Sequence, residues 1–209
     1  MDNYKNIIWD WNGTLLNDID LCISSINRLL EKRKLPLIKK DYYKEIFTFP
    51  VIDYYKKIGF DFNKEPFEVP ALEFINEYKK NFFSCSLHHG AGEILDYFNK
   101  KSKNQYILSA MEQGELEQTV KHFGIEHYFI ELIGIRNHYA FSKIEFGKEL
   151  LKRRNLLVKK TCLIGDSVHD FEVAMELGIS CILLSNGHQA KERLLQLNVP
   201  VYDRLEDLV

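Results

Sequence analysis

Polar side chains follow several short apolar segments of this chain, and their types suit the chemistry of phosphate groups. Asp10 follows the run IIW, Ser109 follows YIL, and Asp166 follows CLIG. Asp170 comes one helical turn after Asp166, and Lys143 begins a segment with helical spacing. The carboxyl ends of parallel strands meet at one sheet edge, where open α/β sheets bind ligands. If these runs are parallel strands, three carboxylates, a hydroxyl and an ammonium gather there.

Such a group of side chains predicts a magnesium and phosphate site. Crowded carboxylates repel one another, and a divalent cation relieves the repulsion; Mg²⁺ prefers carboxylates together with phosphate and water. Lys143 and Ser109 would contact the phosphate as a point charge and a hydroxyl donor. Gly13 and Thr14 follow in a tight turn whose N–H groups could hold an anion. We therefore predict phosphoryl transfer in which Asp10 attacks phosphorus and forms an aspartyl phosphate.

The order of the expected elements predicts an α/β core. Apolar segments of strand length alternate with amphipathic segments of helical period, which is typical of a parallel sheet covered on both faces. The strands are expected over 5–10, 105–110, 131–135, 161–166 and 180–185, with helices over 90–98, 112–123, 142–154, 168–177 and 189–197. We expect a Rossmann-like doubly wound parallel sheet.

Residues 18–86 differ from the rest in their pattern of apolar residues, because helical spacing dominates there and no strand is expected. Helices are expected from Ile19 onward and over 41–49, 51–58 and 71–83. We therefore predict a core at 1–16 and 87–209 and an inserted α-helical cap at 17–86. The aromatic stretch TFPVIDYY, residues 48–55, either faces the substrate or belongs to the core of the cap.

Composition restricts the partners of the protein. The chain has 28 basic and 30 acidic residues and no basic stripe with interleaved aromatics, so we expect no nucleic-acid partner. It has no signal-like segment and no apolar run near the roughly 18 residues of a membrane span, so we expect no membrane partner. The four scattered cysteines are expected to be reduced: Cys22, Cys85, Cys162 and Cys181. We expect a cytoplasmic protein that is a monomer or a weak dimer.

The order and spacing of these motifs resemble those of the haloacid dehalogenase superfamily of hydrolases. Its first motif, D-x-D-x-T, is matched by DWNGT at residues 10–14, and its fourth, G-D-x-x-x-D, by GDSVHD at 165–170. Its second and third motifs, a strand-terminal Ser or Thr and a Lys, are matched by Ser109 and Lys143. The helical insert is similar to the cap of the phosphoglycolate phosphatase and β-phosphoglucomutase branch. The resemblance covers essentially the whole chain.

The resemblance implies a role for each matched residue. Asp10 would be the nucleophile and a Mg²⁺ ligand, Asp166 a second ligand, and Asp170 a support for the metal or its waters. The backbone carbonyl of Asn12 would be a further ligand, whatever its side chain. Ser109, with Ala110 beside it, and Lys143 would hold the phosphate of a small phosphorylated metabolite.

Asn12 departs from the family motif, in which this position is an aspartate that acts as general acid and base. An amide cannot exchange a proton at neutral pH, and loss of such a group typically costs about 10²–10⁴-fold in rate. One interpretation is a phosphatase that is slow or that borrows a histidine, with His169, His88 and His89 as candidates. A second is a protein that binds Mg²⁺ and a phosphorylated ligand with little turnover.

A third interpretation is different chemistry. The phosphonoacetaldehyde hydrolases among the relatives lack this aspartate and use a cap lysine as a Schiff base. The lysines of the expected cap are Lys39, Lys40, Lys44, Lys56 and Lys57, all in charged runs that favour a solvent-exposed position. A dinucleotide-binding function is disfavoured, since no G-x-G-x-x-G follows the first strand.

Overall fold

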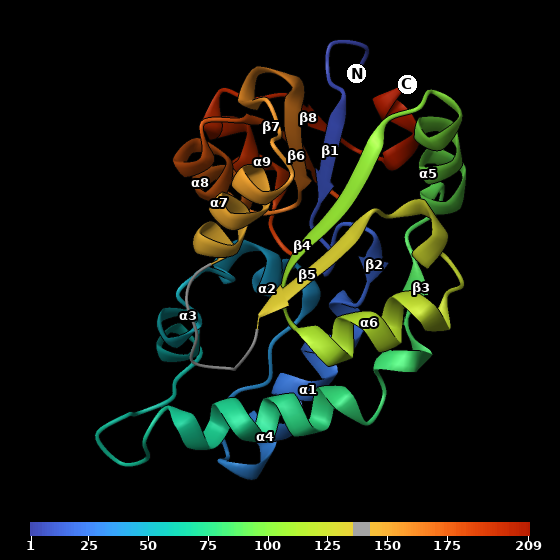
Figure 1. Cartoon of the computed structure of the whole chain (residues 1–209). Coiled ribbons are helices and arrows are strands. Elements are labelled where there is room, and N and C mark those ends of the chain that lie inside the picture. The colour runs from blue at the N-terminus through green and yellow to red at the C-terminus, as the bar shows by residue number, and fades with distance from the viewer. Residues whose placement is uncertain (136–142) are drawn as a thin grey trace.

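The structure, a computed structural model, describes residues 1–135 and 143–209 and confirms the predicted α/β fold (Figure 1). Its main sheet is parallel, with strand order β5-β4-β1-β6-β7-β8. The strands are β1 (Asn6–Trp9), β4 (Asn104–Glu112), β5 (Glu131–Ile135), β6 (Thr161–Gly165), β7 (Ser180–Leu184) and β8 (Val201–Tyr202). The chain winds outward from β1 in both directions, so the carboxyl ends of β1, β4 and β6 lie side by side.

Helices cover both faces of this sheet because its strands are apolar on both sides. In β1, Ile8 packs with the face covered by α7 (Lys143–Arg153) and α8 (Val168–Leu177). Ile7 and Trp9 alternate with it and pack toward α5 (Ala91–Lys100). Figure 1 shows α7 and α8 on one side of the sheet and α5 on the other. The remaining core helices are α6 (Gln113–His122) and α9 (Lys191–Leu194).

Four helices lie beyond the carboxyl ends of the strands (Figure 1). They are α1 (Ile19–Lys32), α2 (Lys40–Ile46), α3 (Val51–Lys57) and α4 (Glu68–Lys79). In α1, Ile19, Cys22, Ile26 and Leu30 are buried on one stripe, which explains why this segment forms an amphipathic helix. The helices thus stand directly over the edge where the polar residues of the core are expected.

A short antiparallel ribbon joins these helices to the sheet, and the sequence did not predict it. β2 (Leu16–Asn17) pairs with β3 (Ser86–Leu87), so the outgoing and returning chains lie side by side. Strands of two residues are too short to show an alternating pattern. The ribbon coincides with the predicted cap boundaries at 16/17 and 86/87, but the division into two domains stays a prediction.

Two further details differ from expectation. β4 continues to Glu112, so Ser109 lies inside the strand instead of ending it. The pairing register of β4 shifts between Leu108 and Glu112, and the N–H of Met111 donates to Ser109 Oγ over 3.0 Å. This irregularity lets the chain continue past a buried serine. The expected start of the helix at residue 142 lies outside the described residues.

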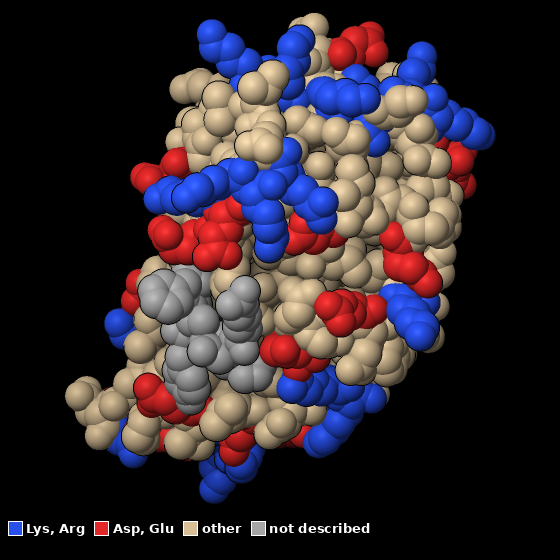
Figure 2. Space-filling model, viewed as in Figure 1, with Lys and Arg blue, Asp and Glu red and all other residues tan. Residues whose placement is uncertain are grey.

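The surface carries both signs of charge in close proximity. Figure 2 shows acidic side chains next to basic ones across one face, and Glu131, for example, contacts both Arg153 and Arg154. No helix within residues 1–135 and 143–209 has the length and apolar character that crossing a membrane requires.

Candidate active site

The strand ends bring three predicted carboxylates together. Asp10 follows β1, Asp166 follows β6, and Asp170 lies in the first turn of α8. One ligand atom from each lies within 4.8 Å of the others, and we call these three residues the acidic cluster. They meet because β1 and β6 pair in parallel with Trp9 opposite Ile164, which aligns their ends. All three are buried.

The start of α8 fixes the orientation of Asp170. Ser167 is the N-cap and accepts a hydrogen bond from the N–H of Asp170, while its own hydroxyl donates to Asp170 Oδ2 over 2.6 Å. The N–H of Asp166 donates to the same oxygen over 3.2 Å. A Cβ on Gly165 would lie 2.3 Å from Asp170 Cγ, so only glycine fits beside this carboxylate. The capping box therefore directs Asp170 toward the acidic cluster.

Lys143 supplies one positive charge to these three carboxylates. Its ammonium contacts Asp10 Oδ1 and lies 2.5 Å from Asp170 Oδ1, and its side chain is buried. Lys143 is the first residue of α7, and its contact with Asp10 places its ammonium at the end of β1. The cluster is nevertheless short of positive charge.

The pKa values of Asp10 and Asp166 express this shortage, whereas contact with Lys143 lowers the pKa of Asp170 against the effect of burial. Burial raises the pKa of Asp10 to about 8, with Asp170 and Asp166 adding to the effect and Lys143 opposing it. Burial also raises the pKa of Asp166 to about 6, although the nearby His188 opposes the shift. A divalent cation would supply the missing charge, and a purely oxygen donor set fits Mg²⁺. The residues present thus suit the predicted metal.

The side chain of Asn12 is held in one orientation. Its Nδ2 donates to Asp18 Oδ2 over 2.8 Å and to the Tyr78 hydroxyl over 2.9 Å. Its Oδ1 lies 3.4 Å from the hydroxyl of Ser109, which donates to it. Because a carboxylate can only accept, Asp18 fixes the amide nitrogen on its own side and leaves the oxygen facing Ser109.

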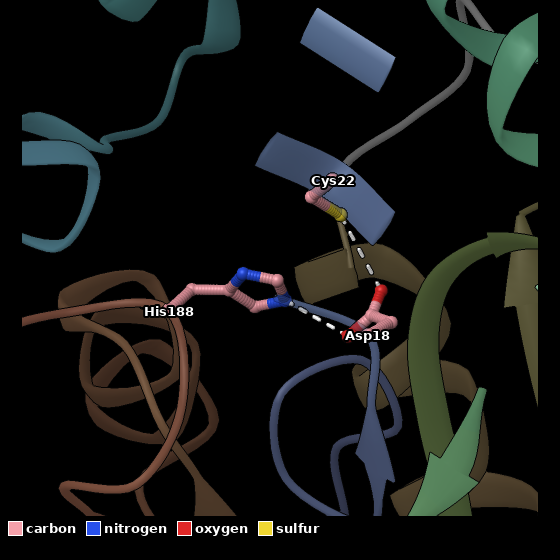
Figure 3. A group of neighbouring side chains, drawn as sticks. All are labelled: Asp18, Cys22 and His188. Carbon is pink, nitrogen blue, oxygen red and sulfur yellow. Dashed lines mark hydrogen bonds and ion pairs between the residues drawn. The ribbon is translucent and has the colours of Figure 1, made fainter. Parts of the chain in front are cut away.

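Asp18 belongs to a second buried charged group that the sequence analysis missed (Figure 3). Its Oδ1 lies 3.1 Å from His188 Nε2, and its Oδ2 accepts from Cys22 Sγ over 3.5 Å. Burial acts against both charges. The ion pair nevertheless holds the pKa of Asp18 at about 2 and raises that of His188 to about 9. The His188 Nδ1 lies 2.9 Å from the hydroxyl of Tyr43. We call this group the Asp18–His188 pair.

His188 also connects the pair to the acidic cluster, because its backbone N–H donates to Asp166 Oδ2 over 2.5 Å. It lies in the loop after β7, at the same sheet edge as the predicted residues. The rule that located Asp10 and Asp166 could have found it, had it been applied to SNGH as well.

The predicted phosphate contacts are less clearly arranged. The N–H of Gly13 donates to the carbonyl of Leu16 over 2.8 Å and to Asp18 Oδ1 over 3.0 Å, and its φ of +76° suits glycine. The Thr14 hydroxyl lies 3.1 Å from Asp166 Oδ1 and 3.3 Å from Asp10 Oδ2. Ser109 is buried and Ala110 lines the adjoining cavity. Phosphate binding by these four residues stays a prediction.

Comparison with known proteins settles the family. The sequence model of haloacid dehalogenase-like hydrolases matches residues 7–184. The chain belongs to this family. The predicted resemblance and the assignment to its hydrolases are therefore confirmed.

Individual relatives of this haloacid dehalogenase-like hydrolase are distant. The phosphoglycolate phosphatase of Pasteurella multocida is 23% identical, over 100% of this chain and 95% of that protein. The tyrosine-protein kinase PtkA of Mycobacterium tuberculosis is 22% identical, over 87% of this chain but only 62% of the kinase. A haloacid dehalogenase-like hydrolase from Streptococcus pneumoniae shares the fold with a TM-score of 0.87 at 17% identity, covering 100% of this chain and 98% of that one.

The histidines proposed to replace the family's acid–base aspartate lie in different settings. His169 stacks on Phe49 with ring centroids 4.6 Å apart and lines the cavity beside the acidic cluster. His88 is buried, with Nδ1 3.1 Å from Asn186 Nδ2, and His89 is exposed and contacts Glu206. His169 is therefore the candidate at the cavity.

The cap lysines considered for a Schiff base do not line the cavity of this haloacid dehalogenase-like hydrolase. Lys44 donates to the carbonyl of Ser185 over 3.0 Å, and the other four are exposed: Lys39, Lys40, Lys56 and Lys57. The arrangement gives no support to Schiff-base chemistry.

A cavity of about 500 Å³ lies between the strand ends and the four helices. Its floor contains the acidic cluster, Asn12, Lys143 and the Asp18–His188 pair. Its upper part is lined by α3, α4 and the segment before α3. The cavity is large enough for a small ligand that reaches the floor.

Proposed function

We propose that this chain is a Mg²⁺-dependent phosphatase that cleaves a phosphate monoester through an aspartyl phosphate on Asp10. The observation that carries the proposal is the acidic cluster at the floor of a ligand-sized cavity, where three buried carboxylates lie together and the Lys143 ammonium contacts two of them. Family membership and the relative named as a phosphatase support the same reaction.

Asp10, Asp166 and the backbone carbonyl of Asn12 would hold the Mg²⁺, with Asp170 in support. When bound, the cation supplies positive charge that binds the phosphate and offsets the charge of the acidic cluster. Lys143 opposes the effect of burial on Asp10, and the charge of Mg²⁺ would add to this opposition and favour the ionised carboxylate for attack.

The reaction has two steps. An oxygen of Asp10 forms a bond to phosphorus, the bond from phosphorus to the leaving oxygen breaks, and that oxygen takes up a proton. Water then attacks phosphorus, loses a proton, and releases inorganic phosphate and the Asp10 carboxylate. In each step Asn12 occupies the position of the family's proton carrier, and its amide can orient a partner by hydrogen bonding but cannot exchange a proton.

Slow turnover follows from this substitution. We expect the second step to be slowed by about 10²–10⁴-fold relative to an aspartate enzyme, so that the phosphoenzyme accumulates. The alternative, a protein that binds Mg²⁺ and a phosphorylated ligand with little turnover, rests on the same residue. The two are separated by whether inorganic phosphate is released repeatedly.

Rapid mixing with 4-nitrophenyl phosphate and Mg²⁺ tests the proposal. A burst of nitrophenol close to one equivalent of enzyme, followed by slow steady release of phosphate, is expected. Asp10→Asn and metal-free enzyme serve as controls and should show no burst. A burst without later phosphate release would favour the binding protein. No burst, together with no adduct on Asp10 by mass spectrometry, would refute the proposed reaction.

A further inference from the structure

We propose that the substrate's leaving group presents an apolar surface of the size of an aromatic ring and carries no negative charge; this inference rests on the proposed phosphatase function. It differs from the phosphoglycolate or sugar phosphate that the family branch implies. Three observations carry it: the apolar lining of the upper cavity, the sign of the charges around that lining, and the space available.

The upper cavity has an apolar wall. Six of its residues come from the segment around the start of α3, from α4 and from the end of β4: Phe49, Val51, Ile52, Phe74, Ile75 and Met111. The apolar wall extends to the acidic cluster, because the ring of Phe49 stacks on His169 and Asp170 is next to His169 in the chain. A leaving group attached to a phosphate at the floor would therefore extend along these side chains.

Hydroxyl-rich leaving groups fit this wall poorly. A sugar hydroxyl placed against these six side chains loses its hydrogen bonds to water and gains none from them, which costs binding free energy. An aromatic ring gains from the same burial. The wall thus favours an apolar group over a polar one of equal size.

The charges that line the upper cavity are acidic. Glu68, Glu112 and Glu115 contribute to its lining. Among residues 1–135 and 143–209, Lys143 is the one lysine that lines the cavity, and no arginine lines it. Lys143 already contacts Asp10 and Asp170. The imidazolium of His188 is paired with Asp18. A carboxylate on the leaving group, as in phosphoglycolate, would meet glutamates and no free lysine or arginine in this part of the chain.

Space supports the same conclusion. A cavity of about 500 Å³ has room for a phosphate that carries a phenyl or benzyl group, and such a group would contact the wall. An apolar ring in contact with such a wall typically changes kcat/KM by about 10²-fold over a group that leaves the wall exposed.

Substrates with similar leaving-group chemistry test this preference. We expect kcat/KM for 2-phenylethyl phosphate with Mg²⁺ to exceed that for phosphoglycolate and glycerol phosphate by about 10²-fold. All three release an alcohol, so the comparison does not depend on an activated phenol. Acetyl phosphate, whose leaving group is too small to reach the wall, measures the chemistry of the floor by itself.

Phosphonates measure the same preference without turnover. In calorimetric titrations with Mg²⁺, benzylphosphonate should bind about tenfold or more tightly than phosphonoacetate, which carries a carboxylate in place of the ring. Ile52→Lys places a cation in the wall and should shift this ratio toward phosphonoacetate by about tenfold. Ile52→Met is the uncharged control, and Val158→Lys, on an exposed residue outside the cavity, controls for added charge.

The outcomes separate the inference from the proposed function. Equal or better binding and hydrolysis of the carboxylate compounds would overturn the apolar leaving group, even if acetyl phosphate is hydrolysed normally. Failure to hydrolyse acetyl phosphate or to form a phosphoenzyme would refute the phosphatase. The phosphonate titrations would still decide which ligand the wall prefers.

Discussion

Two buried charged groups lie side by side at the floor of the cavity, and they differ in how their charges are balanced. The Asp18–His188 pair has one charge of each sign, and its polar atoms bond to Asn12, Gly13, Tyr43 and Tyr78. The acidic cluster has three carboxylates and one contacting ammonium. The pair lowers the pKa of its acid to about 2, whereas the cluster raises that of Asp10 to about 8.

We propose that this difference separates a structural group from a reactive one. A balanced and fully bonded pair is complete without a ligand, so its contribution is to hold its neighbours in place. A cluster with excess charge of one sign is complete only with a cation or a proton. Substitutions in the two groups should therefore have opposite effects on activity and on stability.

Asp10→Asn should have the largest effect on activity. We expect the turnover of acetyl phosphate to fall by about 10⁴-fold or more, because the proposed nucleophile is lost. In metal-free buffer at pH 9, above the pKa of Asp10, the variant should melt at or above the temperature of the wild type, since it removes one of three repelling charges. A lower melting temperature without metal would show that the cluster is balanced already.

Asp18→Ala should have the largest effect on stability. It leaves the His188 imidazolium buried without its partner, which typically costs about 3–5 kcal/mol in the free energy of unfolding. Asp20→Ala is the matched control in the same segment, because the Asp20–Lys40 pair is exposed and should contribute less than about 1 kcal/mol. Urea unfolding of both variants measures the difference, and equal losses would contradict the assignment of Asp18 to a structural pair.

Exchanging the residue types at positions 12 and 18 tests whether Asp18 limits the turnover that an aspartate at position 12 can give. Asn12→Asp alone faces a carboxylate where its Nδ2 now donates over 2.8 Å, so two acids must share a proton. The double variant Asn12→Asp/Asp18→Asn restores the donor and still offers an oxygen to Gly13 and His188. We expect steady-state turnover of the double variant to exceed that of the wild type by about 10²-fold, and that of the single variant by less. A single variant that equals the double one would show that Asp18 does not limit position 12.

The pH dependence of stability tests the charge imbalance of the acidic cluster. The pKa of Asp10 is raised from 3.8 to about 8 on folding, so metal-free stability falls as pH rises through this range. Mg²⁺ must displace that proton, and the shift it produces in melting temperature should grow from pH 5 to pH 8. At about 100 times the Kd of Mg²⁺ the gain is about 2.7 kcal/mol. Asp10→Asn should lose most of this pH-dependent gain, and an equal Mg²⁺ shift at both pH values would contradict it.

The Asp18–His188 pair should respond to pH in a different window. The pKa of His188 is raised from 6.5 to about 9, so its contribution is present below pH 6.5 and is lost as pH rises toward 9. Asp18, lowered from 3.8 to about 2, contributes above pH 4 and loses its effect as pH falls toward 2. Thermal unfolding of Asp18→Asn across pH 2–9 checks both limits. An unchanged profile in this variant would count against the ion pair.

The acidic cluster could be predicted from the sequence because one rule locates it. Asp10 and Asp166 end apolar runs of strand length, and parallel pairing forces such ends together. Asp170 follows by helical spacing. These relations depend on local pattern and on the direction of the strands, both of which the residue types determine.

The Asp18–His188 pair and the partners of Asn12 could not be predicted in this way. Tyr78 is 66 positions from Asn12 and reaches it only because α4 packs across α1 over the strand ends. Asp18 stands at the start of a helix, where an acidic residue is ordinarily a cap. The two-residue strands β2 and β3 and the register shift in β4 leave no periodic signal either.

The Asp18–His188 pair and its hydrogen-bond partners come from different parts of the fold, and this has a consequence for ligand entry. His188 belongs to the sheet side, Tyr43 and Tyr78 belong to α2 and α4, and Asp18 lies on the connection between them. Swinging the helices away from the strand ends would strip the ion pair of both phenols and release the amide of Asn12. The pair thus holds the helices over the strand ends, and any outward movement of α2 and α4 has to break these hydrogen bonds.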